Sequence, residues 1–244
     1  MPKFVLIRHG ESVWNSEGRM QGNLDPELSP RGKRQTGLLV SHLRTHLPRS
    51  VGAIYASPLQ RAAQTAEEIG RAFHLPVIHD HDLREMHLGT WEGKTVAEIQ
   101  ASAPEHYDQW LEDPLTYPAP GGEDLRAFER RAVGALERMQ QAHPGTNLIV
   151  VSHGGVIRAI LCFALGLDIR YLFRLKQNNT AVSQIKLEGR VRQVLLLNDT
   201  CHLGPDCSPR RSSVCPAPKR GTGRPGSPSQ TTGPQDDETT VCGQ

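Results

Sequence analysis

Large apolar side chains are missing from the end of the chain. Residues 204–244 contain no Leu, Ile, Met, Phe, Trp or Tyr, and Gly, Pro, Ser and Thr supply 23 of these 41 residues. Such a segment cannot bury enough apolar surface to offset the conformational entropy that it would lose on ordering. The composition therefore predicts a disordered tail at 204–244 and one globular domain at 1–203.

The chain also lacks a long apolar run and a strong excess of one charge. Its first run, Phe4–Ile7, ends at Arg8 and is too short for the core of a signal peptide. Its longest later run, Val156–Leu167, is interrupted by Arg158 and is too short for a membrane span. The formal net charge is +2, which does not favour a nucleic-acid partner. We expect a cytoplasmic protein, monomeric or homodimeric, without membrane or nucleic-acid partners.

Cysteine is scarce, and most of it lies outside the predicted domain. The chain has five cysteines, and four lie in or beside the tail: Cys201, Cys207, Cys215 and Cys242. Their spacing matches neither paired C-x-x-C metal ligands nor a compact disulfide framework. Free thiols in a reducing compartment are the expectation.

Apolar runs that are typical of strands alternate with amphipathic stretches that are typical of helices. Strands are predicted at 3–8, 51–56, 147–152, 180–187 and 190–197, and helices after Ser29-Pro30 to about 46, after Ser57-Pro58 to about 73, at about 123–143 and from 154 to about 165. This alternation predicts an α/β fold: a three-layer sandwich with helices on both faces of a mainly parallel sheet and an antiparallel hairpin at its edge.

Polar and reactive residues follow three of these strands. Arg8 and His9 end the first, Arg61 comes shortly after the second, and His153 follows the third. Ligands of open α/β sheets bind beyond the carboxyl ends of the strands. We therefore expect two histidines and two arginines to meet at one edge of the sheet.

These residue types supply what metal-free hydrolysis of a phosphate ester needs. The reaction requires a nucleophile, positive charge on the phosphoryl oxygens and an acid for the leaving alkoxide. A neutral His9 can attack, and Arg8, Arg61 and His153 can hold the oxygens. Glu85 is the candidate acid. Glycines beside the two histidines let the backbone approach and offer N–H donors, at Gly10, Gly154 and Gly155.

Five ordered blocks carry a family resemblance. They are Arg8-His9-Gly10-Glu11-Ser12-x-Trp14-Asn15 with Gln21-Gly22, Leu28-Ser29-x-x-Gly32, Ser57-Pro58-Leu59-x-Arg61-Ala62-x-x-Thr65-Ala66, Glu85-x-x-x-Gly89-x-Trp91-Glu92-Gly93, and Ser152-His153-Gly154-Gly155. Over residues 4 to about 202 the chain resembles the histidine phosphatase superfamily, which contains cofactor-dependent phosphoglycerate mutases and their phosphatase relatives.

The resemblance implies a phosphoglycerate mutase-like fold and a role for each matching residue. His9 would be the phosphorylated nucleophile and Glu85 the proton donor. The phosphate pocket would be completed by Arg8, Arg61 and His153. The positions that face the phosphate or the substrate would be Asn15, Gln21, Gly22 and Gly154. No metal or cofactor is expected, and the partner is a small-molecule phosphate ester.

The phosphatase and mutase branches differ in the segment after Glu85. Mutases carry extra basic residues there, whereas residues 86–121 of this chain have one lysine, Lys94, and a net charge of about −5. The segment Pro120-Gly121-Gly122-Glu123 also resembles the phosphatase branch. We therefore predict a phosphatase, with a mutase as the alternative. A non-catalytic phospho-ligand-binding member is a second alternative, although such a member is expected to have lost His9 or Glu85.

Three further patterns are open to two interpretations. Apolar residues of the same region, namely Met86, Leu88, Trp91, Tyr107 and Trp110, either line a leaving-group pocket or pack the core of a small helical cap. The run 79–82 (His-Asp-His-Asp) resembles a metal cluster, but adjacent residues on an extended segment point to opposite faces. Ser152 resembles a nucleophile elbow, but valine replaces the first glycine of that motif.

Overall fold

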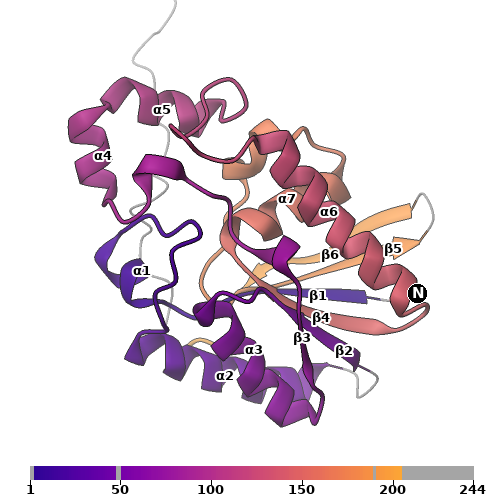
Figure 1. The fold of residues 1–244 in the computed structure, drawn as a ribbon. Coiled ribbons are helices and arrows are strands. Elements are labelled where there is room, and N and C mark those ends of the chain that lie inside the picture. Colours follow the sequence, from indigo (N-terminus) through magenta and orange to yellow (C-terminus); the bar gives the residue numbers. More distant parts are fainter. Residues whose placement is uncertain (1–2, 48–50, 189–190, 205–244) are drawn as a thin grey trace, which may run out of the picture.

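A mixed, mostly parallel sheet runs through the middle of the computed structural model, which describes residues 3–47, 51–188 and 191–204 (Figure 1). Within this part the strands are β1 (Lys3–Arg8), β2 (Val51–Ala56), β3 (Val77–His79), β4 (Asn147–Ser152), β5 (Val182–Glu188) and β6 (Val191–Asp199), in the order β3-β2-β4-β1-β5-β6. β1 to β4 pair in parallel, and β5 is antiparallel to β1 and β6. The predicted α/β sheet with an antiparallel edge is confirmed.

Helices cover both faces of this sheet. One face packs against α2 (Pro30–His46) and α3 (Gln60–Phe73), and the other against α6 (Leu125–Ala142) and α7 (Gly154–Leu165) (Figure 1). Successive side chains of a strand point to opposite faces, so Val5 and Ile7 of β1 join the α2/α3 core while Phe4 and Leu6 join the α6/α7 core. The three-layer architecture is therefore as predicted. In the described part of the chain, no helix combines the length and apolarity that crossing a bilayer requires.

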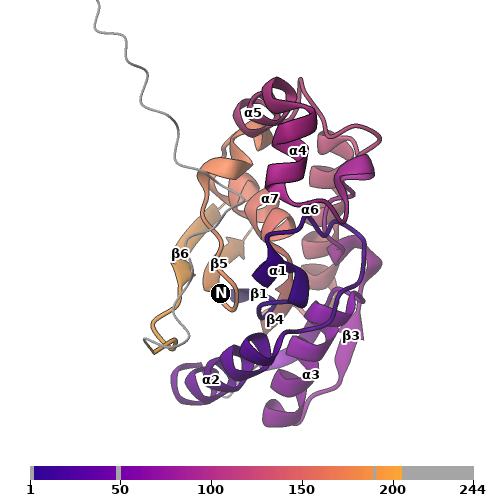
Figure 2. The same cartoon turned by 90° about the vertical axis from the view of Figure 1, so that its left-hand side faces the viewer.

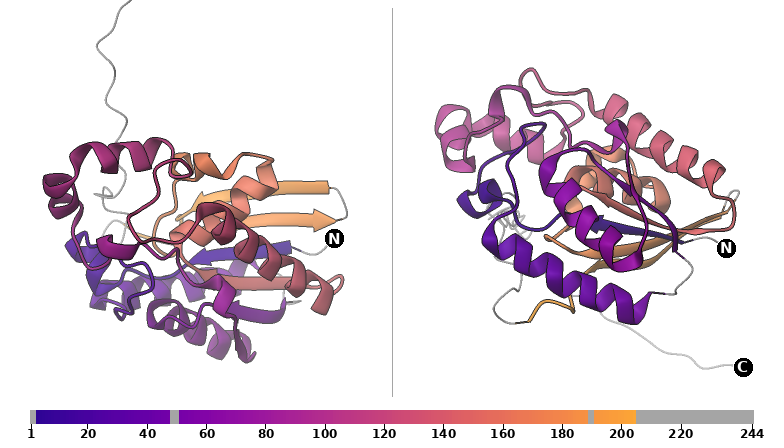
Figure 3. Two further views of the ribbon diagram at one scale, coloured as in Figure 1. Left: turned by 45° about the horizontal axis from the view of Figure 1, so that its top comes forward. Right: turned by 60° about the horizontal axis from the view of Figure 1, so that its bottom comes forward.

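A small helical cap lies beyond the end of the sheet at which β1 ends. It contains α4 (Val96–Ser102) and α5 (Pro104–Glu112), and α1 (Val13–Glu17) lies between it and the α2/α3 layer (Figures 2 and 3). Two short 3-10 turns, η1 (His81–Leu83) and η2 (Gly89–Trp91), lie between β3 and the cap helices, and a third, η3 (Ile169–Arg174), lies between α7 and β5. The cap therefore stands over the edge where the sequence predicts the reactive residues.

Aromatic side chains fill the interior of the cap. The Trp91 ring lies 5.3 Å from that of Trp110 and 5.9 Å from that of Tyr107, and all three are buried. Met86 and Leu88 belong to the same buried cluster. Of the two interpretations that the sequence left open, this burial supports the one in which the five residues pack the core of the cap.

One local prediction is wrong, one short strand was not predicted, and two predictions fall outside the described residues. Helix α3 begins at Gln60 without a side-chain cap, and Ser57, predicted as its N-cap, contacts His153 instead. Strand β3 was not predicted because it has three residues and two are exposed. Residues 189–190, beside the predicted hairpin turn at Glu188-Gly189, and the tail from 205 onward lie outside the described part of the chain.

Candidate active site

His9 lies immediately after β1, and its ring is held by the backbone. The side chain is 2% exposed, and its backbone N–H donates to the Ser152 carbonyl oxygen of β4 (3.0 Å). Ring nitrogen Nδ1 lies 2.6 Å from the carbonyl oxygen of Gly10. A carbonyl oxygen only accepts, so Nδ1 carries the proton and Nε2 keeps its lone pair.

The surroundings of His9 keep its imidazole neutral. Burial lowers its pKa well below the ordinary value of 6.5, and the charges of Arg61 and Arg8 lower it further, against a smaller opposite effect of the Gly10 hydrogen bond. At neutral pH the Nε2 lone pair is therefore available for nucleophilic attack.

His153 stands next to His9 at the start of α7. The two ring centroids are 5.1 Å apart, and His153 is fully buried. The Ser57 Oγ accepts from the Leu59 N–H (3.3 Å), which leaves the hydroxyl hydrogen free to be donated to His153 Nε2 (2.8 Å). In the tautomer in which this hydroxyl donates to Nε2, Nδ1 of His153 carries the ring proton. This buried nitrogen has no partner in the described structure.

Arg8 and Arg61 bring two buried positive charges to the same place. Carbonyl oxygens hold part of each guanidinium: Gln177 O accepts from Arg8 Nη1 (2.6 Å), and Gly22 O and Leu24 O accept from Arg61 Nη2 and Nη1 (2.8 and 2.7 Å). Burial lowers both pKa values to about 10, so both groups remain charged at neutral pH. Within the described residues neither guanidinium forms an ion pair with a carboxylate, and both Nε atoms are buried without a partner.

Glu85 is the remaining predicted catalytic residue, and it lies beside the start of α7. Its carboxylate accepts the backbone N–H groups of Gly155 and Met86, both at 3.0 Å, and so lies over the first turn of α7. A Cβ atom at Gly155 would lie 2.3 Å from Glu85 Oε1, so this approach requires glycine. The Glu85 charge raises the pKa of both Arg8 and Arg61. The structure thus brings together the five predicted catalytic residues.

Comparisons with known proteins agree with this arrangement. The family model of the histidine phosphatase superfamily (branch 1) matches residues 4–200. The chain belongs to the histidine phosphatase superfamily. Phosphoserine phosphatase 1 of Hydrogenobacter thermophilus is 42% identical over 205 residues, which cover 84% of this chain and 95% of that protein.

Two further relatives link this histidine phosphatase to hydrolysis. A metal-independent phosphoserine phosphatase of Arabidopsis thaliana is 38% identical over 160 residues, covering 65% of this chain and 66% of that protein. The structure of a mycobacterial glucosyl-3-phosphoglycerate phosphatase in complex with VO3 superposes with a TM-score of 0.76 at 31% identity, covering 82% of this chain and 100% of that one. The predicted family, fold and phosphatase activity are confirmed by these similarities.

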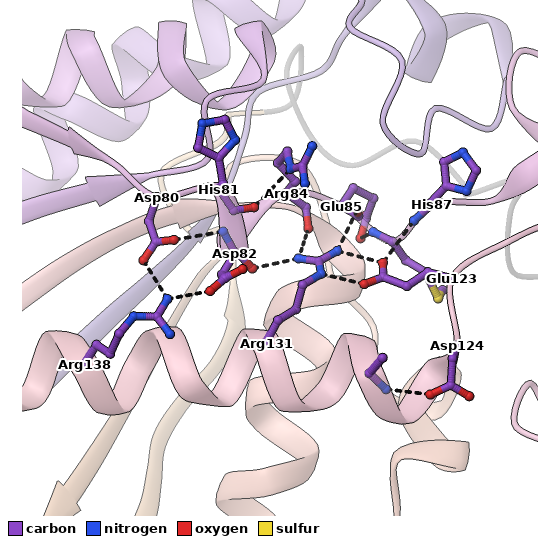
Figure 4. A network of polar contacts seen from close by, with 12 residues as sticks. Asp80, His81, Asp82, Arg84, Glu85, His87, Glu123, Asp124, Arg131 and Arg138 are labelled. Atoms are coloured by element: carbon purple, nitrogen blue, oxygen red, sulfur yellow. Dashed lines mark hydrogen bonds and ion pairs between the residues drawn. The ribbon is translucent and has the colours of Figure 1, made fainter.

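An arginine that the sequence did not single out holds Glu85 in place. Arg131 on α6 donates to the carbonyl oxygens of Asp82 (2.7 Å), Arg84 (2.6 Å) and Glu85 (3.0 Å), and two of its nitrogens contact the Glu123 carboxylate (2.7 and 2.9 Å) (Figure 4). One guanidinium therefore fixes the segment that carries Glu85 to α6. On an amphipathic helix, nothing in the sequence separates such an arginine from a solvated one.

Replacing Arg131 by methionine should lower kcat by ~10–100-fold, because a small displacement of a catalytic group is costly in rate. The matched control is Arg138→Met, seven residues further along α6, where the guanidinium forms ion pairs with Asp80 and Asp82 (3.2 and 2.6 Å) (Figure 4). That control should retain turnover within about twofold. Steady-state kinetics on both variants, with melting temperatures, make the comparison; equal kcat losses would contradict the positioning role of Arg131.

Asn15, on α1, and Gln21, in the loop after α1, were predicted to face the substrate, and both contact Ser12. The Asn15 Oδ1 accepts from the Ser12 N–H (3.2 Å) and from Asn179 Nδ2 (3.1 Å), while Gln21 Oε1 accepts from the Ser12 hydroxyl (2.8 Å). These bonds hold the loop beside the site, and contact with substrate stays a prediction.

The two predicted glycines, Gly22 and Gly154, each lie beside an arginine of the site. Gly22 adopts a φ of 48° and presents its carbonyl oxygen to Arg61, and a Cβ there would lie 1.9 Å from Glu92 Oε1. A Cβ at Gly154 would meet Arg8 Nε at 3.6 Å and Arg158 Nη1 at 3.7 Å. Glycine is therefore favoured at position 22 by its φ and by the nearby Glu92 side chain, whereas the distances at position 154 are ordinary van der Waals contacts.

Gln177 and Asn179 were missed because residues 175–179 read as an ordinary polar loop. Gln177 is 3% exposed, yet both atoms of its amide are buried without a partner in the described structure. Its neighbour Asn179 donates to the His9 carbonyl oxygen (3.2 Å). A buried, unpaired amide beside Arg8 is costly unless a ligand satisfies it.

Proposed function

We propose that this histidine phosphatase hydrolyses phosphate monoesters of small metabolites through a phosphohistidine formed on Nε2 of His9. One observation carries the proposal: among the residues that the structure describes, the buried Arg8 Nε, Arg61 Nε and His153 Nδ1 have no partner around a neutral His9. Buried charge without a counter-ion is unfavourable, and a bound phosphate dianion supplies the missing negative charge.

In the first step, His9 Nε2 attacks phosphorus and the bond to the ester oxygen breaks. The departing oxygen takes the proton of the Glu85 carboxyl group and leaves as an alcohol. Arg8, Arg61 and His153 stabilise the charge on the phosphoryl oxygens as it shifts in the transition state. Backbone hydrogen bonds to Glu85 and to His9 Nδ1 fix both groups before the substrate arrives.

In the second step, water replaces the alcohol. The Glu85 carboxylate takes a proton from the water, whose oxygen attacks phosphorus, and the N–P bond breaks. Inorganic phosphate leaves, His9 is neutral again, and Glu85 holds the proton for the next cycle. The same carboxyl group therefore serves as acid and then as base.

The substrate class follows from the groups beside the phosphate site. Gln177 offers an amide donor and acceptor next to Arg8, which suits a small alcohol carrying further polar groups, as in phosphoserine. The relative from Hydrogenobacter thermophilus is a phosphoserine phosphatase, which supports the same class. The acidic segment 86–121 disfavours a polyanionic mutase substrate.

The test is turnover of p-nitrophenyl phosphate in excess EDTA, followed by a panel containing phosphoserine, a phosphoglycerate and a sugar phosphate. We expect full activity with the chelator, since Arg8, Arg61 and His153 already supply the positive charge at the phosphate. Phosphoserine should show the highest kcat/KM of the panel. Activity that disappears in EDTA and returns with Mg²⁺ or Zn²⁺ would contradict the mechanism, and transfer of phosphate between phosphoglycerates at the hydrolytic rate would favour the mutase.

The neutral histidines also predict how stability depends on pH. Burial is the largest cause of the lowered pKa of His9 and of His153, whereas in the unfolded chain both titrate near 6.5. Below pH 6.5 the unfolded chain therefore takes up protons that the folded chain does not, and the free energy of unfolding falls. Between pH 6.5 and 5.5 the loss should be about 1 kcal/mol for each histidine.

Urea unfolding of the native chain and of His153→Asn at these two pH values measures this effect. The variant keeps every other titrating group, so its loss should be smaller by about 1 kcal/mol. Identical losses in the two proteins would mean that His153 is not held neutral.

A further inference from the structure

A second group of chemically reactive side chains lies outside the phosphate site, where the end of β6 meets α2. Asp199 is the last residue of β6, Cys201 lies in the turn that follows, and His42 lies on α2, far away in the sequence. Their donor atoms all lie within 4.8 Å of one another. The cysteine spacing considered alone gave no sign of this group, because two of its three members are not cysteines.

The distances within the group are close to those of a metal site. Cys201 Sγ lies 3.3 Å from Asp199 Oδ2 and 4.0 Å from His42 Nδ1. Ligands at ~2.0–2.3 Å from a tetrahedral zinc ion are separated from one another by roughly 3.3–3.6 Å. Seating a cation therefore requires the Cys201–His42 separation to close by about 0.5 Å, and the His42–Asp199 separation, which is within 4.8 Å, to close by at most about 1.5 Å.

We propose that His42 Nδ1, an Asp199 carboxylate oxygen and Cys201 Sγ bind one divalent cation of the zinc class. A thiolate and an imidazole select Zn²⁺, or Co²⁺ as its substitute, over Mg²⁺ and Ca²⁺, which take oxygen ligands. On binding, the cation replaces the thiol proton that Cys201 donates to Asp199, and one proton is released to solvent.

Two further histidines, His46 and His202, lie beside His42. The His42 ring stacks on His46, with centroids 4.2 Å apart, and lies 5.5 Å from the ring of His202. His202 Nε2 is tied to Thr180 Oγ1 (3.1 Å), while its Nδ1 is buried and has no partner in the described residues. This unpaired nitrogen is an independent sign of an unfilled polar site, and a water on the cation could satisfy it.

The site is separate from the chemistry at His9. It contains none of the five residues that carry the proposed hydrolysis, and Cys201 is exposed, so a cation can reach it from solvent. Catalysis without a metal and binding of one cation at this site are therefore compatible.

Titration of the full, metal-stripped chain with Co²⁺ tests the proposal. We expect one equivalent to bind and to give a thiolate-to-cobalt charge-transfer band together with the visible bands of a tetrahedral ion. Cys201→Ser and His42→Gln should each abolish the charge-transfer band or weaken binding by at least ~100-fold, since even supporting residues of metal sites contribute ~10–100-fold.

Matched controls separate this site from the other thiols and histidines. Cys207→Ser removes a thiol of the C-terminal segment, and His81→Gln removes a histidine outside the group; both should bind Co²⁺ as the native chain does. Turnover of p-nitrophenyl phosphate verifies that every variant is folded. Absence of binding to the native chain, or a charge-transfer band that persists in Cys201→Ser or His42→Gln, would overturn the assignment.

Discussion

His9→Ala should abolish both turnover and phosphoenzyme formation, lowering kcat by ~10⁴–10⁶-fold, the range seen when an enzymatic nucleophile is removed. The physical reason is that His9 alone combines a neutral ring, a proton fixed on Nδ1 by Gly10 and a position beside two buried guanidinium groups. His153 cannot replace it, because its Nε2 is engaged with Ser57 and its Nδ1 carries the proton. Rapid acid quench with a ³²P-labelled substrate, followed by an alkali-stability assay, measures the phosphohistidine directly.

The control for this experiment is His87→Ala, which removes an imidazole near the cap whose side chain is 45% exposed. It should leave labelling intact and turnover within about threefold, as is usual for a surface substitution. Since Arg8, Arg61 and His153 are untouched in His9→Ala, that variant should still bind inorganic phosphate. Alkali-stable label in His9→Ala would remove the assignment of the nucleophile.

Glu85→Gln should slow alkyl phosphates by ~10²–10⁴-fold, the usual share of a general acid. Its effect on p-nitrophenyl phosphate should be smaller in the phosphorylation step, because that leaving group needs little protonation. The dephosphorylation step still lacks its base, so the variant should accumulate phosphohistidine from the aryl substrate. Single-turnover measurements on both substrates separate the two steps.

A matched control for this substitution is Glu92→Gln. The Glu92 carboxylate also accepts two backbone N–H groups, those of Asn23 and Leu88. At Glu92 both donors bond to Oε1, so a glutamine there can keep both bonds. At Glu85 the two donors use different oxygens, so Glu85→Gln should also lose ~1–3 kcal/mol of stability. Glu92→Gln should affect aryl and alkyl substrates equally. Equal slowing of the two phosphorylation steps in Glu85→Gln as well would show that Glu85 is not the acid.

The main strands and the convergence of the site were predictable from local patterns. β1, β2 and β4 begin and end at the predicted residues, because each is a short apolar run bounded by polar or turn residues. Their parallel pairing places the ends of β1 and β4 side by side, with Arg8 opposite Ser152 in the register. His9 and His153 therefore meet as a consequence of topology, which the alternation of strands and helices already indicates.

In the cap, the local sequence pattern does not distinguish a pocket wall from a packed core. An aromatic residue contributes the same apolar surface to a pocket wall and to a core, so the composition of residues 86–110 fits both. The packing of Trp91 against Tyr107 and Trp110 decides between them, because these contacts bury all three rings. Ser57 is a comparable case: its hydroxyl suits an N-cap, and only the position of His153 draws it into the site.

Local sequence patterns predict the α/β sandwich, the family and the set of ionisable groups at the sheet edge, because these depend on periodicity and on motifs of adjacent residues. The side chains that support these groups depend on three-dimensional packing. Arg131 reaches three carbonyl oxygens across the gap between α6 and the segment before Glu85, and His42 meets Cys201 across 159 positions. Such pairs are set by how helices pack on the sheet and by the direction of each side chain, and no local pattern in the sequence encodes either.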